Sequence, residues 1–264
     1  MTFALLFVSL QVLLAILAPV LGFQDPYHQV MIQRMKPPNE LNWLGTDHLG
    51  RDVLSRIVYG YRTSLLTCST AVLMALLFGG VLGVLSAWYG GWFDRIAMRV
   101  MDIFFAFPIL LLAIGVIAII GASIWGAAIA IAIVYTPIFA RLLRGPALVI
   151  ASSEYVQGAL AIGASDTRIL VYHLLPNLAS VILVQTSLLL SAAILVESSL
   201  SFLGLGAQPP VPSLGLALSE GRNFLLLSPW PAVFSGLAIL FLSFGFNLLG
   251  DALRDTLDPR LRQA

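Results

Sequence analysis

Long apolar stretches dominate the sequence, and short polar breaks separate them. Six approach the about 20 residues that a helix needs to cross the hydrocarbon core of a bilayer. They lie at about 3–21, 64–88, 103–120, 124–143, 178–203 and 232–250. Only Gly121, Ala122 and Ser123 separate the third stretch from the fourth, which predicts a tight helical hairpin. The pattern predicts an all-α, polytopic membrane protein with six transmembrane helices.

Three polar segments, 22–63, 144–177 and 204–231, lie between these stretches. The first apolar stretch lacks the basic start and small-residue cleavage site of a signal peptide, so we interpret it as the first span. With both termini on the cytoplasmic side, eight basic residues lie inside and six outside. Basic residues favour the cytoplasmic side, so this excess, though small, favours cytoplasmic termini.

Composition supports the membrane assignment, because 59% of the residues are apolar and 10% are charged. Soluble domains average about 45–50% and about 25%. The net charge of +1 and the lack of a basic cluster argue against nucleic-acid partners. Cys68 is the single cysteine, so we expect neither an internal disulfide nor a multi-thiolate metal site.

Two kinds of chemistry have no sequence signature here. The single lysine, Lys36, does not follow a glycine-rich turn, so we expect no P-loop and no ATP bound by this chain. The three histidines lie far apart and form no metal-ligand motif. Gly79, Gly80 and Gly83 lie within an apolar stretch, where small residues permit close helix packing. We interpret these glycines as packing positions.

The mid-chain segment 154–177 reads EYVQGALAIGASDTRILVYHLLPN. Its apolar residues recur at helical spacing up to Gly163, after which Ser165 or Asp166 can cap a second helix. This pattern predicts two short amphipathic helices joined at the glycine. Their apolar faces need a partner, which is the bilayer surface, the protein's own spans or a groove on another protein.

The same segment resembles the EAA loop of type I permease subunits in ATP-binding-cassette importers. The resemblance rests on Gln157-Gly158-Ala159, on Gly163 after three further residues, and on His173-Leu174-Leu175-Pro176 after nine more. Gln157 and Gly158 replace the usual Glu and Ala, and His173 stands where an apolar residue is common. In that family the loop is a coupling helix that docks on the ATPase. The resemblance therefore implies coupling roles for Glu154, Tyr155, Gln157, Gly158, Ala159, Gly163, Ala164, Ser165 and Asp166.

Three further segments resemble the subfamily that imports dipeptides, oligopeptides or nickel. They are LNWLGTDHLGRDVLSRIVYGYRTSL at 41–65, LSFLGLGAQPP at 200–210 and FNLLGDALRDTLDPRLR at 246–262. The resemblance is greatest to the second permease of a dipeptide or oligopeptide importer. It implies a type I permease fold, a homologous permease partner, two ATPases that use ATP and Mg, and a periplasmic solute-binding protein.

The segment around Asp47, Gly50, Arg51 and Asp52 allows two interpretations. Thr46 or Asp47 can cap a helix, and Asp52 can pair with Arg56 one turn later. The simpler interpretation is a capped amphipathic helix at the outer face. The alternative is a periplasmic rim that receives the binding protein or lines the entrance.

Glu197 lies inside the fifth apolar stretch, where a carboxylate is costly and normally faces a partner or a wet cavity. One hypothesis places it on the translocation pathway, against the ammonium group of a peptide. The alternatives are a structural pair with an arginine such as Arg222 and a position near the outer interface. Other charges, including Asp94, Arg95, Arg99 and Asp102, fit surface ion pairs at helix ends.

The sequence thus predicts three parts: a first helix with a periplasmic loop at 1–63, a permease domain at 64–251, and a cytoplasmic tail at 252–264. We expect a non-enzymatic permease of the bacterial inner membrane that carries dipeptides or oligopeptides. Nickel or metal chelates and glutathione-like peptides are alternative substrates. The competing classes are a self-sufficient secondary transporter or channel and a membrane scaffold. A secondary transporter would favour paired inverted repeats and several intramembrane charges, and the sequence shows neither convincingly.

Overall fold

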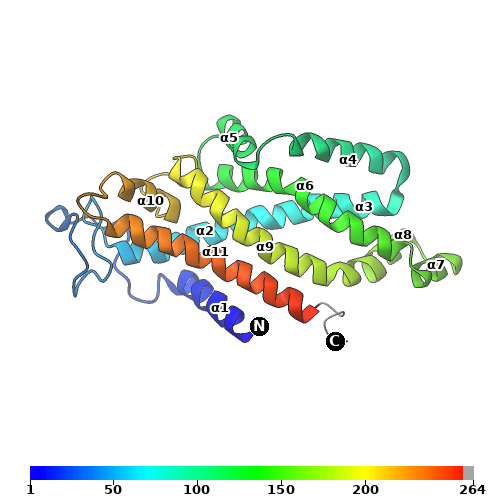
Figure 1. The fold of residues 1–264 in the computed structure, drawn as a ribbon, viewed down its shortest axis with the longest axis horizontal. Helices are drawn as coiled ribbons and strands as arrows, with labels where there is room; N and C mark the ends of the chain where they lie inside the picture. The colour runs from blue at the N-terminus through cyan, green and yellow to red at the C-terminus, as the bar shows by residue number, and fades with distance from the viewer. Residues whose placement is uncertain (258–264) are drawn as a thin grey trace.

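The computed structural model describes residues 1–257, and its regular structure there is helical, apart from an isolated bridge between Thr46 and Asp52. The helices pack lengthwise around a shared core (Figure 1). The elements are α1 (Thr2–Leu17), a 3-10 turn (Met31–Gln33), α2 (Val53–Ala75), a π turn (Leu76–Gly80), α3 (Val81–Tyr89), α4 (Gly91–Phe105), α5 (Ile109–Ile120), α6 (Ile124–Ala151), α7 (Glu154–Ala161), α8 (Asp166–Ile169), a second π turn (Leu170–Leu174), α9 (Leu175–Phe202), α10 (Leu214–Arg222) and α11 (Trp230–Leu257).

Four continuous helical segments are long and apolar enough to cross a membrane: Val53–Tyr89, Ile124–Ala151, Asp166–Phe202 and Trp230–Leu257. The pair α4 and α5 makes a fifth if its two halves are taken as one span. α1 is apolar but has only 16 residues, fewer than the about 20 of a typical span. The multi-pass, all-helical class is therefore confirmed, while six spans stay a prediction.

The second span is predicted to begin at residue 64, but the helix begins earlier in the structure, at Val53. Asp52 begins the helix, because its side-chain carboxylate accepts a hydrogen bond from the Ser55 backbone N–H at 2.7 Å. The polar residues that follow the cap concealed the start in the hydropathy pattern. The predicted boundary between the outer loop and the permease domain thus falls inside α2.

The third predicted span, 103–120, is wrong as a straight helix. α4 starts twelve residues earlier, at Gly91, and the chain bends by 94° between α4 and α5. Pro108 stands at the cap position of α5 with extended backbone angles. Proline lacks the backbone N–H that a continuing helix needs, and it disfavours helical angles in the residue before it. The helical hairpin between α5 and α6 is confirmed, with Ser123 Oγ accepting from the Gly126 backbone N–H at 2.9 Å.

The fifth predicted span, 178–203, also starts earlier than expected. Pro176 does not delay the start, because it lies just after the second π turn, where the regular i→i−4 hydrogen-bond pattern of the helix is already interrupted. α8 and the second π turn continue directly into α9. Two further expectations change: α10 lies within the predicted loop 204–231, and α11 runs through the start of the predicted tail, of which 258–264 lie outside the described residues.

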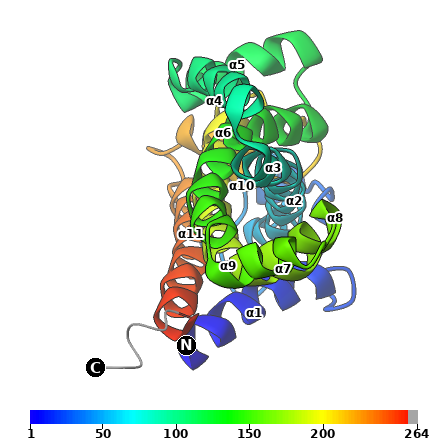
Figure 2. The same ribbon diagram turned by 90° about the vertical axis from the view of Figure 1, so that its right-hand side faces the viewer.

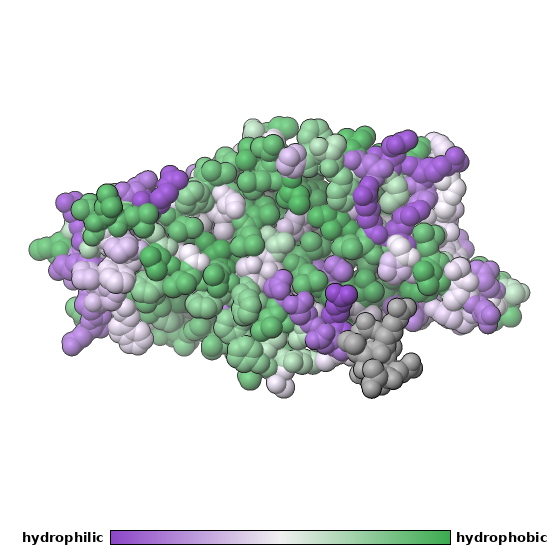
Figure 3. All heavy atoms as spheres, in the orientation of Figure 1, coloured by the Kyte–Doolittle hydropathy of each residue, from purple (hydrophilic) through white to green (hydrophobic). Residues whose placement is uncertain are grey.

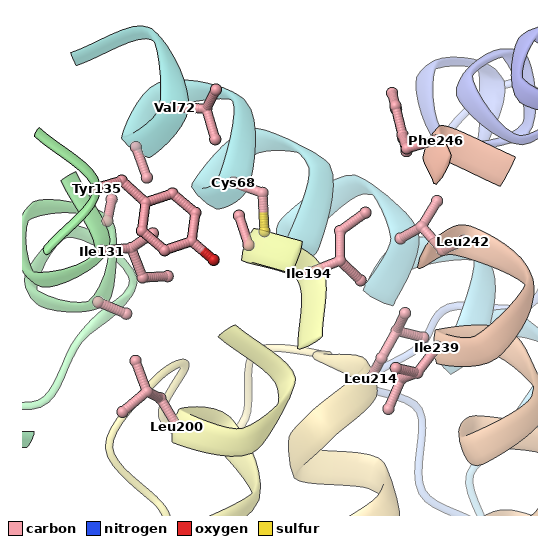
Figure 4. Close-up of a cluster of buried hydrophobic side chains, with 14 of the residues drawn as sticks. Cys68, Val72, Ile131, Tyr135, Ile194, Leu200, Leu214, Ile239, Leu242 and Phe246 are labelled. Carbon is pink, nitrogen blue, oxygen red and sulfur yellow. The ribbon is translucent and has the colours of Figure 1, made fainter. Parts of the chain in front are cut away.

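The core lies where α2, α6, α9, α10 and α11 meet (Figure 4). Cys68 of α2, Tyr135 of α6, Ile194 of α9 and Leu242 of α11 are all buried there. Outside this core, green apolar side chains cover the middle of the molecule, and hydrophilic side chains gather toward its two ends (Figure 3). That distribution fits a protein whose middle contacts lipid.

Close packing between the α2–α3 segment and α6 depends on glycine, as the sequence predicted. A Cβ atom on Gly79 would run into the backbone carbonyl oxygen of Thr136, and one on Gly83 into that of Ala140. Small residues at such contacts let two helix backbones approach closely in a membrane. The prediction that these glycines serve packing is therefore confirmed.

Candidate functional site

The predicted coupling segment forms the tip of one end of the molecule, seen at the right of Figure 1 and facing the viewer in Figure 2. α7 starts at Glu154 and includes Tyr155, Gln157, Gly158 and Ala159. Gly163 follows with a φ of +84°, a left-handed conformation that glycine adopts without strain. Ala164 then donates its backbone N–H to the Ala159 carbonyl at 3.0 Å. The predicted first short helix and the glycine that ends it are thus present, whereas α8 is the start of the long helical segment Asp166–Phe202 rather than a separate short helix.

Residue by residue, this segment differs from the expected amphipathic helix pair. Ser165 occupies the cap position before α8, and Asp166 is its first residue, but neither hydroxyl nor carboxylate makes a cap hydrogen bond. Val156 is fully buried, against a small apolar cluster that includes Ile169 and Leu174. Tyr155 and Ile162 stay exposed, at 49% and 87%. One apolar residue therefore anchors α7 to the protein's own spans, while the other side of the segment is open to a partner.

A group of four charged side chains lies at the opposite end of the molecule. Arg51 Nε is 2.6 Å from Asp47 Oδ2, and one of its terminal nitrogens is 2.8 Å from Glu220 Oε2. Arg56 also contacts both carboxylates, at 3.6 Å and 3.4 Å. Except for Glu220, these side chains are nearly inaccessible. We name Asp47, Arg51, Arg56 and Glu220 the outer charge cluster; it fastens the first loop and the start of α2 to α10.

The details of this region correct two sequence expectations. Asp52, rather than Thr46 or Asp47, caps α2. Its other side-chain oxygen accepts from the Asn42 side-chain amide at 3.0 Å, so Asp52 does not pair with Arg56. Gly50 has a φ of +74°, and a Cβ there would collide with the Val30 carbonyl group. All four predicted rim residues, Asp47, Gly50, Arg51 and Asp52, are buried.

Asp47, His48 and Glu220 lie close enough to hold a metal ion, since their ligand atoms are within 4.8 Å of one another. Both carboxylates, however, already accept hydrogen bonds or ion pairs from Arg51 and Arg56. Two guanidinium charges beside the site oppose a further cation. The His48 ring stacks on Phe224, with ring centroids 5.2 Å apart. The arrangement fits a structural ionic cluster better than a metal centre.

Glu197 is the other predicted site residue, and it is 1% exposed. Its carboxyl group bridges two helices: Ser64 Oγ of α2 donates to Oε2 at 2.9 Å, and Ser201 Oγ of α9 donates to Oε1 at 2.7 Å. α10 lies against the same place, because a Cβ on Gly215 would collide with the Ser198 carbonyl. In this structure, Glu197 therefore joins α2 to α9 beside α10.

The expected pair between Glu197 and Arg222 is wrong. The Arg222 guanidinium lies over the Phe202 ring, 4.7 Å from its centroid. Within residues 1–257, the partners of the Glu197 side chain are serine hydroxyl groups rather than arginines. Hydroxyl donors suffice because a buried carboxyl group needs hydrogen bonds and does not require an opposite charge.

Sequence reasoning missed Glu220 as a site residue. Its signal was visible, because it is the single acidic residue of the segment 204–231. Its partners are 164 and 169 residues away in the sequence, so no local spacing could reveal them. Ser64 and Ser201 gave no signal, since serine is common in membrane helices.

Residues 79–263 match the family described as binding-protein-dependent transport system inner membrane component. The chain belongs to this family. The match covers α3 to α11 and includes the coupling segment and Glu197. The outer loop and most of α2 lie before it.

The alignments with curated relatives cover nearly the whole chain. A dipeptide transport system permease protein, DppC, of Alkalihalophilus pseudofirmus is 43% identical over 258 residues, covering 98% of this chain and 85% of the relative. A glutathione transport system permease protein, GsiD, of Pectobacterium atrosepticum is 45% identical, covering 97% and 86%. Both alignments therefore include the outer loop and α2.

Solved structures support the permease fold. An inward-facing MetNI methionine ABC transporter chain superposes with a TM-score of 0.63 at 16% identity, covering 77% of this chain and 97% of that one. A chain of an amino acid ABC transporter with histidines gives 0.57 at 14% identity, with 77% and 95% covered. At these identities the likeness concerns the fold alone.

Proposed function

We propose that this permease carries dipeptides or other short peptides, glutathione included, across the bacterial inner membrane. The observation that carries the proposal is the 43–45% identity with permeases named for dipeptide and glutathione transport, over nearly the whole chain. Chelated nickel is the competing substrate class.

Uptake by the native host tests the substrate. Cells that lack the gene are compared with complemented cells for uptake of a labelled dipeptide, of labelled glutathione and of nickel. We expect loss of uptake of at least one peptide and unchanged uptake of nickel. Loss of nickel uptake alone would refute the peptide assignment while leaving the membership of the permease family intact.

The assembly that we propose contains this chain, a homologous permease, two ATPases and a periplasmic binding protein. Membership of a binding-protein-dependent family supports this composition. ATP and Mg would act in the ATPases, and no covalent chemistry would take place in this chain. Purification through a C-terminal tag, followed by mass spectrometry, should recover a second permease and P-loop ATPases. Transport by this chain alone, without ATP, would instead indicate a secondary transporter.

We place both termini and α7 on the cytoplasmic side, and the outer charge cluster on the periplasmic side. The first residues of α1 and the last turn of α11 lie close together in both views (Figures 1 and 2). α7 and the outer charge cluster lie at opposite ends of the molecule. A reporter that functions only in the cytoplasm should be active when it is fused after α11. An active periplasmic reporter at that position would reverse the proposed orientation.

ATP binding drives such a permease only if the ATPases bind more tightly to one of its conformations. The exposed side of the coupling segment offers the contact, since Ile162 is 87% exposed beside Gly163. Ile162→Asp should abolish recovery of the ATPases without lowering the melting temperature. Leu226→Asp, at a fully exposed position of the outer end, is the matched control and should keep the ATPases. Equal recovery with both variants would remove the coupling role from this surface.

The outer rim is proposed to receive the binding protein through its exposed surface. Its charged residues support it from within, because Asp47 and Arg51 are only 4% and 3% exposed. Leu41 and Trp43 of the same segment are 74% and 71% exposed and are the better candidates for contact. Trp43→Ala should weaken binding-protein-stimulated ATP hydrolysis more than basal hydrolysis. An equal effect on both rates would argue against a docking role.

A further inference from the structure

One face of α4 carries a stripe of exposed side chains that has no role in the proposed transport step. Trp92, Arg95, Arg99 and Ile103 follow one another at intervals of three or four residues, so they lie on the same side of the helix. Arg95 and Arg99 are exposed, and Trp92 and Ile103 are 72% and 59% exposed. We call these four residues the α4 stripe.

Among residues 1–257, the arginines of the α4 stripe have no acidic partner. The two nearby carboxylates on α4, Asp94 and Asp102, are taken by Arg144 and Arg141 of α6. The contact between Asp94 and Arg144 is bidentate, with both N···O distances at 2.6 Å. Arg95 Nε donates only to the Gly91 carbonyl at 3.2 Å, and no contact within residues 1–257 neutralises Arg99. The pairs cancel, and the region retains two positive charges.

These charges lie at the edge of the apolar surface. α4 follows directly after the membrane-spanning segment Val53–Tyr89, so its first turn lies at the membrane boundary. Phe93, Ile96 and Val100 are exposed on the same helix, at 41–43%. In Figure 3 a hydrophilic patch covers this part of α4 at the upper right and adjoins green apolar surface. Tryptophan is the residue that favours the headgroup level of a bilayer.

We propose that the α4 stripe binds the headgroup of an anionic phospholipid such as phosphatidylglycerol. Arg95 and Arg99 contact the phosphate, because guanidinium groups donate paired hydrogen bonds to phosphate oxygens. Trp92 lies at the headgroup level, and Ile103, one turn beyond Arg99, contacts the acyl chain. Two unneutralised positive charges beside exposed apolar side chains complement a lipid that joins a negative headgroup to hydrocarbon tails.

The geometry favours a lipid over an ATPase at this place. α4 runs along the long axis of the molecule, while the coupling segment protrudes from its end (Figure 1). An ATPase on the coupling segment thus approaches along the axis, away from the stripe. The lipid proposal is independent of the transported substrate, and the comparison of the parent chain with its variants needs neither the ATPases nor a binding protein.

Lipid quenching at a single labelled position tests the proposal. Cys68 is fully buried, so a fluorescent thiol label on Ile103→Cys reports on the α4 stripe alone. The labelled full chain is reconstituted in phosphatidylcholine nanodiscs that contain a small fraction of either spin-labelled phosphatidylglycerol or spin-labelled phosphatidylcholine. Each arginine should favour the anionic lipid about fivefold, so the two together give about a 25-fold preference.

Three variants separate charge from structure. In R95Q/R99Q, the two spin-labelled lipids should quench the label equally. R95K/R99K keeps both charges and should keep most of the preference for phosphatidylglycerol. Arg34→Gln changes an exposed arginine of the outer loop and should leave that preference unchanged. Size-exclusion profiles establish that each variant is folded. Equal quenching by both lipids in the parent chain, or a preference that survives R95Q/R99Q, overturns the proposal. A label that neither lipid reaches once the partner subunits are bound also overturns it, because a protein then covers the stripe.

Discussion

Removing the charge of Glu220 should destabilise this permease strongly, because that carboxylate is shared by two arginines. The outer charge cluster contains two carboxylates and two guanidinium groups, so its formal charge is zero. Glu220→Gln keeps the side-chain shape but leaves a net charge of +1 in a largely buried place. Arg51 then loses its ion pair with Glu220, at 2.8 Å, and Arg56 loses a longer one, at 3.4 Å.

The size of the effect follows from burial. Breaking a fully buried ion pair by removal of one partner costs about 3–5 kcal/mol. The Glu220 side chain is 20% exposed, so water screens part of the uncompensated charge and we expect about 3 kcal/mol, the lower end of that range. For a chain of this size, that loss lowers the melting temperature by about 6–12 °C.

Thermal melting of the detergent-purified chain, followed by size-exclusion chromatography, measures this loss. Glu40→Gln is the matched control, because Glu40 is exposed on the same outer segment. Arg51→Gln combined with Glu220→Gln restores a net charge of zero and keeps the contact between Asp47 and Arg56. The double variant should therefore melt above Glu220→Gln. A melting temperature of Glu220→Gln within about 1 °C of the control, or strictly additive losses in the double variant, would refute the reasoning.

Two further substitutions test the packing and the buried carboxyl group. Gly83→Ala should cost about 1–3 kcal/mol, because its Cβ meets the α6 backbone, while Gly115→Ala, with open space around its Cβ, should be neutral or slightly stabilising; equal melting temperatures would contradict the close contact. Ser64→Ala should cost about 1–3 kcal/mol because it removes a donor to Glu197, whereas Ser86→Ala removes a buried hydroxyl without a hydrogen-bond partner among the described residues and should cost less. If both serine variants melt alike, the bridge through Glu197 contributes nothing.

Hydropathy predicted where apolar helices lie, because burial in lipid imposes a long apolar run on each of them. It did not predict the bend at Pro108, since α4 and α5 together have the composition of one span while the proline ends the helix within it. Hydropathy also gave the wrong start for α2, because the cap at Asp52 is polar and lies outside the apolar run. Apolar composition determines which segments lie in the membrane, whereas individual caps and prolines determine where each helix starts.

The candidate sites divide in the same way. The coupling segment is local in sequence, so its first short helix and the glycine after it could be predicted. The outer charge cluster and the bridge through Glu197 join residues more than 130 positions apart, and such contacts leave no local pattern. Family resemblance indicated which segments matter, but it gave no reason to expect that Arg51 and Glu197 would be buried inside the subunit.

The distribution of polar contacts predicts which parts of the permease move together. The outer charge cluster joins α2 to α10, and Glu197 joins α2 to α9, both through buried groups that are costly to separate. α4 has only two buried residues and is attached to α6 by two ion pairs, of which the one between Arg141 and Asp102 is exposed and the one between Arg144 and Asp94 is partly exposed.

We therefore expect α2, α9 and α10 to move as one body, while α4 changes position relative to them. Cysteine variants at exposed positions carry spin labels without interference from the buried Cys68. The distance between labels at Leu66 of α2 and Leu195 of α9 should stay constant when ATP is added to the assembled importer, and the distance between Leu66 and Ile103 should change. A shift in the first distance without one in the second would mean that the buried polar contacts separate during transport, and that partly exposed ion pairs hold better than their burial indicates.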